Sequence, residues 1–287
     1  MLARDCDSAL ENNIPKIEEL RKQFNKSYVV IIENDSKDNT KSILHNWAIN
    51  SKEVFVISED TGKDTIPSSN IDGHLRGMTE YRIGKMAAFR NKYLDFVALH
   101  DNTIDYLINV DIDVYDFNVS SIVQGIENAP DDWTALLANG RLFAKIGDKI
   151  IPSKYYDNFA YVPFDNEHYD VTFEEMYLNS SQLEKALKRK SYVQCKSAFG
   201  GLGIFKYQYI KGFHYQALKN SRSELMESMC EHISLCKHLN KFGTNYIVSN
   251  MQLWYEKIKT PGDYIVFIIG NRKFIKLWEF IRRRKFR

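Results

Sequence analysis

The stretch YLINVDID at residues 106–113 decides how the sequence is organised. Its first five residues are mostly apolar and include β-branched side chains, which predicts a short buried strand. The stretch ends in Asp111 and Asp113, and alternate side chains of an extended chain point to the same face. Two carboxylates are therefore expected to lie together where this strand ends.

Strands and helices alternate on both sides of this stretch, as apolar runs and apolar residues at helical spacing indicate. The predicted strands are residues 28–33, 54–57, 106–110 and 134–138, and the predicted helices include residues 8–24, 79–100 and 223–240. Such alternation implies right-handed crossovers and an α/β fold with a mainly parallel, Rossmann-like sheet flanked by helices. Ligands of these sheets bind at the carboxyl ends of strands. Two acidic pairs fall at such ends, one at residues 33 and 35 and the other at residues 111 and 113.

The composition is that of a globular protein. Among 287 residues, 44% are hydrophobic and 13% aromatic, which excludes a disordered or collagen-like chain. The formal charge is only +2, which argues against a dedicated nucleic-acid-binding protein. The four cysteines are too few and too scattered for a disulfide framework, so a reducing compartment is the simpler interpretation.

Nothing in the sequence predicts a secretory signal or a membrane span. The first thirty residues contain no apolar core of a signal peptide. The longest purely apolar run, residues 265–269, is far shorter than the roughly 20 residues that a spanning helix needs. We therefore expect a cytoplasmic protein, either soluble or peripheral on the inner face of a membrane.

Asp111 and Asp113 form a hard-oxygen site suited to Mg²⁺ or Mn²⁺. Such an ion neutralises a diphosphate and acts as a Lewis acid when a nucleotide diphosphate departs from a sugar. One alternative is a solvated acidic turn. Another is the aspartyl nucleophile of haloacid-dehalogenase-like phosphatases, but that motif lies on the first strand and requires Thr or Val where this chain has Tyr115.

Further polar residues surround this proposed site in the sequence. Glu33 and Asp35 are candidates to accept hydrogen bonds from a nucleobase or ribose, while Ser36 or Asp38 caps the following helix. The predicted helix before the D-x-D strand carries basic residues that either approach nucleotide phosphates or form a solvated face. These basic residues are Arg82, Lys85 and Arg90.

Two later segments are also candidates. The turn at residues 199–203, which contains Gly200 and Gly201, lets backbone approach a ligand closely or simply reverses the chain. Glu231 is a candidate general base or acceptor contact, and a solvated helix glutamate is the alternative. Cys230 and His232 are about 200° apart on a helix, so they do not converge on one zinc ion.

Taken in order, these segments resemble a glycosyltransferase of the GT-A fold. More narrowly, they resemble the capsule-associated α-1,3-mannosyltransferase-like family of fungi and its bacterial relatives. The resemblance spans roughly residues 3–250. The segments that carry it are ARDC at 3–6, ENDSxDxT at 33–40, RxxxMAxxRN at 82–91, NVDID at 109–113, YYDxFA at 155–160, SAFGGLGI at 197–204 and CEH at 230–232.

The resemblance implies a metal-dependent transfer of sugar from a GDP- or UDP-linked donor to a glycan or lipid-linked acceptor, in capsule or lipopolysaccharide synthesis. The alternatives are a non-catalytic GT-A-like nucleotide-sugar-binding protein and a nucleotidyltransferase. The family opens with a strand before the ARDC segment, so that strand is expected to be very short here or the start to be trimmed. By resemblance, Asp111 and Asp113 hold the ion, and Glu33 and Asp35 lie near the base and ribose. The resemblance also implies that the donor pocket is lined by Arg4, Arg82 and Arg90. The 200–203 turn and Glu231 would then lie near the sugar and the acceptor.

The last seventeen residues, NRKFIKLWEFIRRRKFR at 271–287, differ from the rest. They carry eight basic residues and one acidic residue, a local charge of +7, whereas the other 270 residues carry 31 basic and 36 acidic, a charge of −5. An apolar helical stripe runs through them at Phe274, Leu277, Trp278 and Ile281. A basic amphipathic helix of this kind suits an anionic membrane surface, and docking on the protein core is the alternative. We therefore divide the chain into a catalytic domain at 1–262 and this segment at 263–287.

Overall fold

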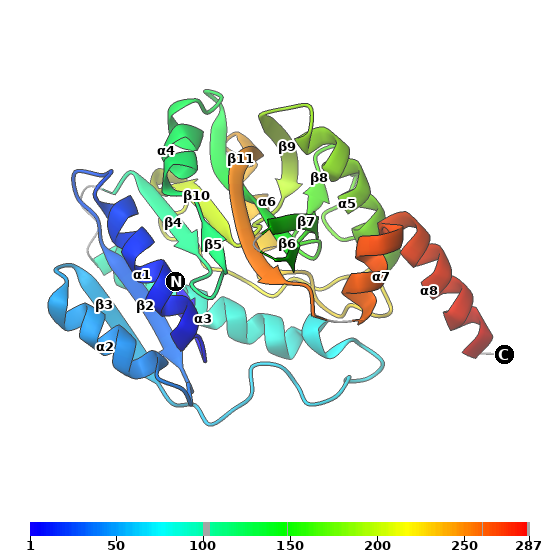
Figure 1. Ribbon diagram of the computed structural model, residues 1–287, viewed down its shortest axis with the longest axis horizontal. Helices are drawn as coiled ribbons and strands as arrows, with labels where there is room; N and C mark the ends of the chain where they lie inside the picture. The colour runs from blue at the N-terminus through cyan, green and yellow to red at the C-terminus, as the bar shows by residue number, and fades with distance from the viewer. Residues whose placement is uncertain (100–103, 148, 260, 286–287) are drawn as a thin grey trace.

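The computed structural model describes residues 1–99, 104–147, 149–259 and 261–285 (Figure 1). The N-terminal part is an α/β unit whose three strands pair in parallel in the order β1-β2-β3. All six residues of β2 are buried, as the apolar run predicts for a strand covered on both faces. The elements are β1 (Leu2–Ala3), α1 (Asp7–Arg21), β2 (Val29–Asn34), α2 (Thr40–Asn50) and β3 (Val54–Glu59). The first strand is thus two residues long.

A 3₁₀ turn and a long helix lead into the second sheet. The helix, α3, matches the predicted 79–100 closely, although His100 lies outside the described residues. This part comprises η1 (Arg76–Met78), α3 (Glu80–Leu99), β4 (Tyr106–Val110), β5 (Asp116–Phe117), α4 (Val119–Glu127), β6 (Trp133–Ile146), β7 (Lys149–Tyr155), β8 (Val162–Pro163), α5 (Phe173–Leu187), β9 (Tyr192–Ser197), β10 (Leu202–Lys206), η2 (Tyr207–Tyr209), α6 (Glu231–Leu239) and β11 (Thr244–Lys257).

The second sheet has the strand order β4-β10-β6-β11-β9-β8, with β5 beside β11 and β7 beside β6. Among its described pairs only β6 and β11 run parallel, so the parallel character expected from the sequence is concentrated in the N-terminal sheet. The reason lies in the connections, because β6 and β7 are joined too closely for a crossover and must form a hairpin. The α/β architecture with flanking helices is nevertheless the one predicted.

Two hydrophobic layers cover the sheet. On β6, Leu136 and Ala138 face the layer that contains α1, α2 and α4, while Ala135 and Leu137 face the layer with α3, α5 and α6. This alternation is that of a strand buried on both sides. The four cysteines are buried free thiols: Cys6, Cys195 and Cys236 lie in these layers, and Cys230 lies in a smaller cluster with Phe199 and Ile233.

The helix predicted at residues 223–240 begins only at Glu231. Its predicted first turns are held as irregular chain, since Ser228 N–H donates to the carbonyl of Met78 and Met229 N–H donates to that of Leu218. These tertiary hydrogen bonds therefore keep residues 223–230 out of the helix, although the spacing of their apolar residues is helical.

A cavity of about 550 Å³ lies between β2 and β4. Val29 and Val30 line one side and the β4 residues line the other, with side chains of α1 and α3 above and below. The Met1 ammonium donates to the carbonyl of Val30 at 2.8 Å at this place.

Two C-terminal helices, α7 (Pro261–Ile269) and α8 (Asn271–Lys285), complete the chain, and α8 extends beside α5 at the edge of the molecule (Figure 1). Trp278 packs on Phe173 with ring centroids 5.0 Å apart, and Phe274 packs on Tyr177 at 5.4 Å. The predicted apolar stripe is therefore divided, because these two residues dock on α5 while Leu277 and Ile281 stay 44% and 49% exposed. Among the described residues, no helix has the length and apolar character needed to cross a membrane.

Candidate active site

The D-x-D pair lies directly after β4, as predicted. Ile112 and Val114 are fully buried, whereas Asp111 is partly exposed and Asp113 exposed. The carboxylates of Asp111 and Asp113 therefore both lie on the solvent-accessible side of the segment. The backbone N–H of Asp111 donates to the carbonyl of Gly201 at 2.9 Å, which ties the pair to the glycine turn.

The donor set fits Mg²⁺ or Mn²⁺ bound together with a substrate. Within the described parts of the chain, no group of three or more His, Cys, Asp or Glu side chains is arranged to hold an ion. If an ion binds here, Asp111 and Asp113 would be the two carboxylates that the protein contributes. This is the usual arrangement for Mg²⁺ sites in which substrate phosphates supply further oxygens.

A third carboxyl group, Asp157, lies close to this pair. It accepts hydrogen bonds from the backbone N–H groups of Gly200 and Ala160, both at 3.2 Å. Burial raises the pKa of Asp157 to about 6 and that of Asp111 to about 8, and Asp113 and Asp157 add to the rise at Asp111 while Arg90 opposes it. The site thus has an excess of acidic groups that a cation would neutralise. In the sequence, Asp157 was marked only by its place in the YYDxFA segment.

Arg90 and Glu231 form a buried ion pair. Their side chains are 3% and 5% exposed, and Arg90 Nε lies 3.0 Å from Glu231 Oε1. Arg90 also lies 3.8 Å from Asp111, and its guanidinium is 5.4 Å from the centre of the Phe199 ring. Although burial alone would raise it, the pKa of Glu231 is about 2 because of the adjacent Arg90.

This placement differs from the sequence-based expectation for both residues. Arg90 was expected in the donor pocket and Glu231 at the acceptor, whereas the structure directs each toward the other in the interior. The cause is geometric, since α3 and the first residue of α6 meet beneath the D-x-D segment. A carboxylate with so low a pKa is a weak base. Arg90 brings positive charge to Asp111, and Glu231, which opposes that effect at Asp111, holds the guanidinium in place.

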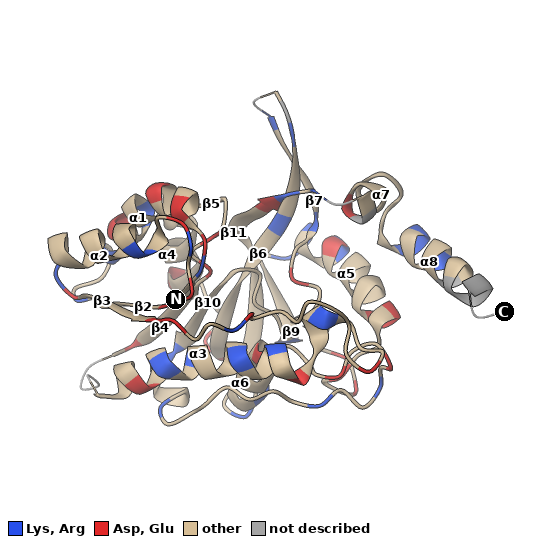
Figure 2. Cartoon of the chain, turned by 90° about the horizontal axis from the view of Figure 1, so that it is seen from below, with Lys and Arg blue, Asp and Glu red and all other residues tan. Residues whose placement is uncertain are grey.

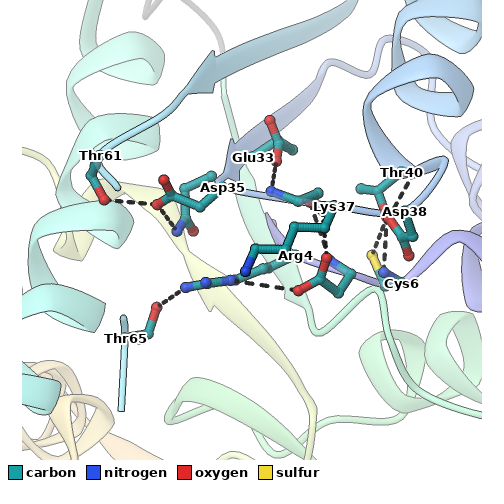
Figure 3. Close-up of polar contacts among 12 residues, drawn as sticks. Arg4, Cys6, Glu33, Asp35, Lys37, Asp38, Thr40, Thr61 and Thr65 are labelled. Carbon is teal, nitrogen blue, oxygen red and sulfur yellow. Dashed lines mark hydrogen bonds and ion pairs between the residues drawn. The ribbon is translucent and has the colours of Figure 1, made fainter. Parts of the chain in front are cut away.

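The predicted base and ribose residues lie at the end of β2 (Figure 3). Glu33 is fully buried and accepts from the Ser36 N–H at 2.9 Å and from the Ser58 hydroxyl, so it holds the turn after β2. Asp35 takes a left-handed conformation with φ 52° and is partly exposed. Of the two, Asp35 is the one available to a ligand.

The segment at residues 61–65 lies across this end of the sheet (Figure 3). Asp35 accepts from the hydroxyl of Thr61 and the N–H of Gly62, both at 2.7 Å. Arg4 donates to the Thr65 hydroxyl at 2.9 Å, and Lys85 donates to the carbonyl of Asp64 at 2.8 Å. Three predicted donor-binding residues therefore converge on one short segment.

Arg82, another predicted donor residue, contacts its own end of the helix. Its guanidinium donates to the carbonyl of Gly77 at 2.9 Å, inside the 3₁₀ turn that precedes α3. This contact stabilises the start of the helix.

The glycine turn is packed against β6. Gly200 and Gly201 have φ values of 68° and 87°, which side chains rarely adopt. A Cβ on Gly200 would stand 2.2 Å from the carbonyl oxygen of Ala138. Glycine is therefore required at residue 200 by the packing of the turn on β6. The turn brings its backbone beside Asp111 and Asp157.

Comparison with known proteins agrees with this architecture. The mannosyltransferase PcManGT from Pyrobaculum calidifontis, in complex with GDP-Man and Mn²⁺, superposes with a TM-score of 0.50 at 11% identity, over 94% of this chain and 61% of that one. Weaker similarities are to S. aureus TarS 1–349 (TM-score 0.43, 12% identity, 92% and 60%) and to GalNAc-T7 with UDP, GalNAc and Mn²⁺ (0.39, 12%, 84% and 41%). The chain thus spans less than two thirds of each of these structures.

The family of the chain follows from its amino-acid sequence. No curated protein is similar enough in sequence to count as a match. The family model described as Cryptococcal mannosyltransferase 1 matches residues 3–236, which is most of the chain. With the GT-A fold of glycosyltransferases and this match, the chain belongs to the Cryptococcal mannosyltransferase 1 family.

Proposed function

We propose that the protein transfers a mannosyl unit from GDP-mannose to an acceptor hydroxyl and depends on a divalent metal ion. The observation that carries this proposal is the pair Asp111 and Asp113 at the carboxyl end of β4, beside a turn in which only glycine fits. Membership of a mannosyltransferase family supports the choice of sugar. The complex of PcManGT with GDP-Man and Mn²⁺ supports the choice of donor and metal.

In this mechanism the residues of the chain bind and orient the donor. Asp111 and Asp113 hold Mn²⁺ or Mg²⁺, which when bound supplies positive charge to the departing diphosphate. Asp35 accepts hydrogen bonds from the base or ribose, and Arg4 and Lys85 provide positive charge to the phosphates. The backbone of the glycine turn borders the sugar.

The buried pair has a supporting role in the same mechanism. Glu231 fixes the guanidinium of Arg90, and Arg90 limits the repulsion among the acidic groups at Asp111. Without the positive charge of Arg90, the acidic groups would repel one another more strongly before the ion binds. We assign Glu231 to positioning in place of proton transfer.

A mutational experiment tests the assignment. Replacing Asp111 and Asp113 by Ala should abolish mannosyl transfer and Mn²⁺-dependent hydrolysis of GDP-mannose, whereas Asp131→Ala, at an exposed position, should leave both unchanged. GDP-mannose with Mn²⁺ should also stabilise the native protein, by about 2.7 kcal/mol at a hundred times the dissociation constant. Full activity of the double variant would exclude this function.

We further propose that the acceptor is a glycan or a lipid-linked glycan of cell-surface polysaccharide synthesis, reached at an anionic membrane surface. The surface of α7 and α8 supports this. It exposes apolar side chains together with basic ones, and Figure 2 shows basic residues along α8. The exposed apolar residues are Tyr264, Ile265, Ile268, Leu277, Phe280 and Ile281, and the exposed basic residues are Arg272, Lys273 and Lys276.

This surface begins close to the site. Lys259, two residues before α7, has its pKa raised by Glu256 and, to a smaller extent, by Asp113. Lys154 pairs with Asp263 at 3.0 Å and fixes the first turn of α7. An acceptor held at the membrane would therefore lie near the D-x-D pair.

A further inference from the structure

The buried face of α1 contains one polar residue. Leu10, Ile17 and Leu20 form an apolar stripe at helical spacing, and Asn13 occupies the same stripe with no exposed surface. A side-chain amide in such a place is unfavourable unless it is hydrogen-bonded. Its Nδ2 has such partners, which explain why an amide is there, whereas its Oδ1 has none among the described residues.

The amide of Asn13 reaches the D-x-D segment. Nδ2 donates to the carbonyl of Ile112 at 2.8 Å and to that of Val114 at 2.7 Å. These two carbonyls belong to the residues on either side of Asp113. One buried side chain thus fixes the backbone carbonyls of the two residues that flank Asp113.

A second contact from α1, made by Lys16, holds the same stretch of chain. Lys16 pairs with Asp116 and lies 3.4 Å from the carbonyl oxygen of Phe117. The stretch at 112–117 is therefore held to α1 at both ends. Because Ile112 and Val114 are themselves fully buried, the backbone at Asp113 has little freedom to change the direction of its side chain.

We propose that Asn13 is a positioning residue for the metal site, holding Asp113 in the orientation in which it shares an ion with Asp111. This inference rests on the proposed metal-dependent function. Groups that orient metal ligands contribute strongly to metal affinity although they do not touch the ion. A purely structural role would require the same hydrogen bonds for folding but would leave the affinity of the folded protein for metal unchanged.

The test compares Asn13→Leu with a matched control, Asn12→Leu. Leucine keeps the γ-branched shape of Asn13 and removes the donor. Asn12 is an exposed neighbour whose amide donates to the carbonyl of Ser8 at 3.1 Å. Mn²⁺ affinity is measured by isothermal titration calorimetry in the presence of GDP, and folding by circular dichroism. We expect the Mn²⁺ dissociation constant to rise about 10- to 100-fold in Asn13→Leu and to stay within about twofold in Asn12→Leu.

A folded Asn13→Leu protein that binds Mn²⁺ within about twofold of the wild type would overturn the proposal, even if its melting temperature were lower. If that variant does not fold, Asn13→Ser replaces it, because a serine hydroxyl is too short to reach both carbonyls. The same criterion then applies. Absence of Mn²⁺ and GDP-mannose binding in the wild type would instead remove the proposed function, so the two failures are distinguishable.

Discussion

Arg90 on α3 and Glu231 at the start of α6 lie 3.0 Å apart in the interior, and Arg90 extends from that pair toward Asp111 at 3.8 Å. One buried guanidinium thus connects the helical layer to the D-x-D segment. Breaking a buried pair by removing one partner leaves an uncompensated charge in the interior. The pair is therefore a determinant of stability as well as of the electrostatics of the site.

Glu231→Ala should lower the free energy of unfolding by about 3–5 kcal/mol, the cost of leaving Arg90 buried without its partner. Asp95→Asn, which removes an exposed pair with His214, should lower it by less than about 1 kcal/mol. Urea unfolding followed by fluorescence measures both. A Glu231→Ala protein as stable as the wild type but without activity would show that Glu231 acts in chemistry and not in the buried pair.

Mn²⁺ binding should depend on pH through Asp111. With a pKa of about 8, this carboxyl is mainly protonated at neutral pH in the metal-free protein, and a metal ligand must be deprotonated. Affinity should therefore rise with pH from about 6 to about 8 and level off above that, as the pKa of about 8 requires. Calorimetry in buffers of different ionisation enthalpy would detect the released proton. Affinity that is constant across this window would contradict the prediction.

Asp35→Ala should raise the KM for GDP-mannose about tenfold or more, since a hydrogen bond to a charged group is worth about 1.5–3 kcal/mol. Hydrogen bonds from Asn34, Thr61 and Gly62 hold the pKa of Asp35 well below its usual range, so it is ionised wherever the enzyme is assayed. Steady-state kinetics with varied donor measure the change. Asp60→Ala is the control, because this exposed carboxylate pairs with Lys41. An unchanged KM would place the nucleoside elsewhere.

Phe280→Glu should weaken binding to vesicles that contain anionic lipid by about tenfold or more, because full burial of a Phe side chain is worth about 1.5–3 kcal/mol. Phe280 is 53% exposed on α8, and Leu99→Glu changes an equally apolar residue that is 84% exposed on α3. Vesicle sedimentation compares the two. Equal binding of both variants and the wild type would mean that this surface does not contact the membrane, and would leave the enzymatic assignment intact.

The N-terminal part of the fold was predictable because its signals are local. The apolar run at 28–33 and the helical pattern at 79–100 correspond to β2 and α3 within one or two residues. The directions of the later strands were not predictable, since the close connection between β6 and β7 forces a hairpin that no single run of residues reveals. Likewise, the irregular chain before α6 is held by Met78, which is 150 positions away from Ser228 in sequence.

The candidate site divides in the same way. The place of Asp111 and Asp113 directly after β4 followed from the apolar run, but residues 112–113 form a turn and do not continue the strand. The tight turn at Gly200 followed from the glycines. The pairing of Arg90 with Glu231 joins residues 141 positions apart, so the sequence supplied both groups but not their contact. The role of Asn13 was not predictable, because its burial and its contacts with residues about 100 positions away appear only in the fold.

The burial of the four cysteines has a consequence for reactivity. Burial raises the pKa of Cys6 to about 12 and that of Cys236 to about 11, and raises those of Cys195 and Cys230 well above their usual value. Only a thiolate reacts readily with alkylating reagents, so the native protein should resist them. Each labelled thiol then records an opening of its own surroundings: Cys6 at the start of α1 beside the donor residues, and Cys195 on β9 between β11 and β8. Alkylation rates would therefore separate local opening of the donor end from unfolding of the whole molecule.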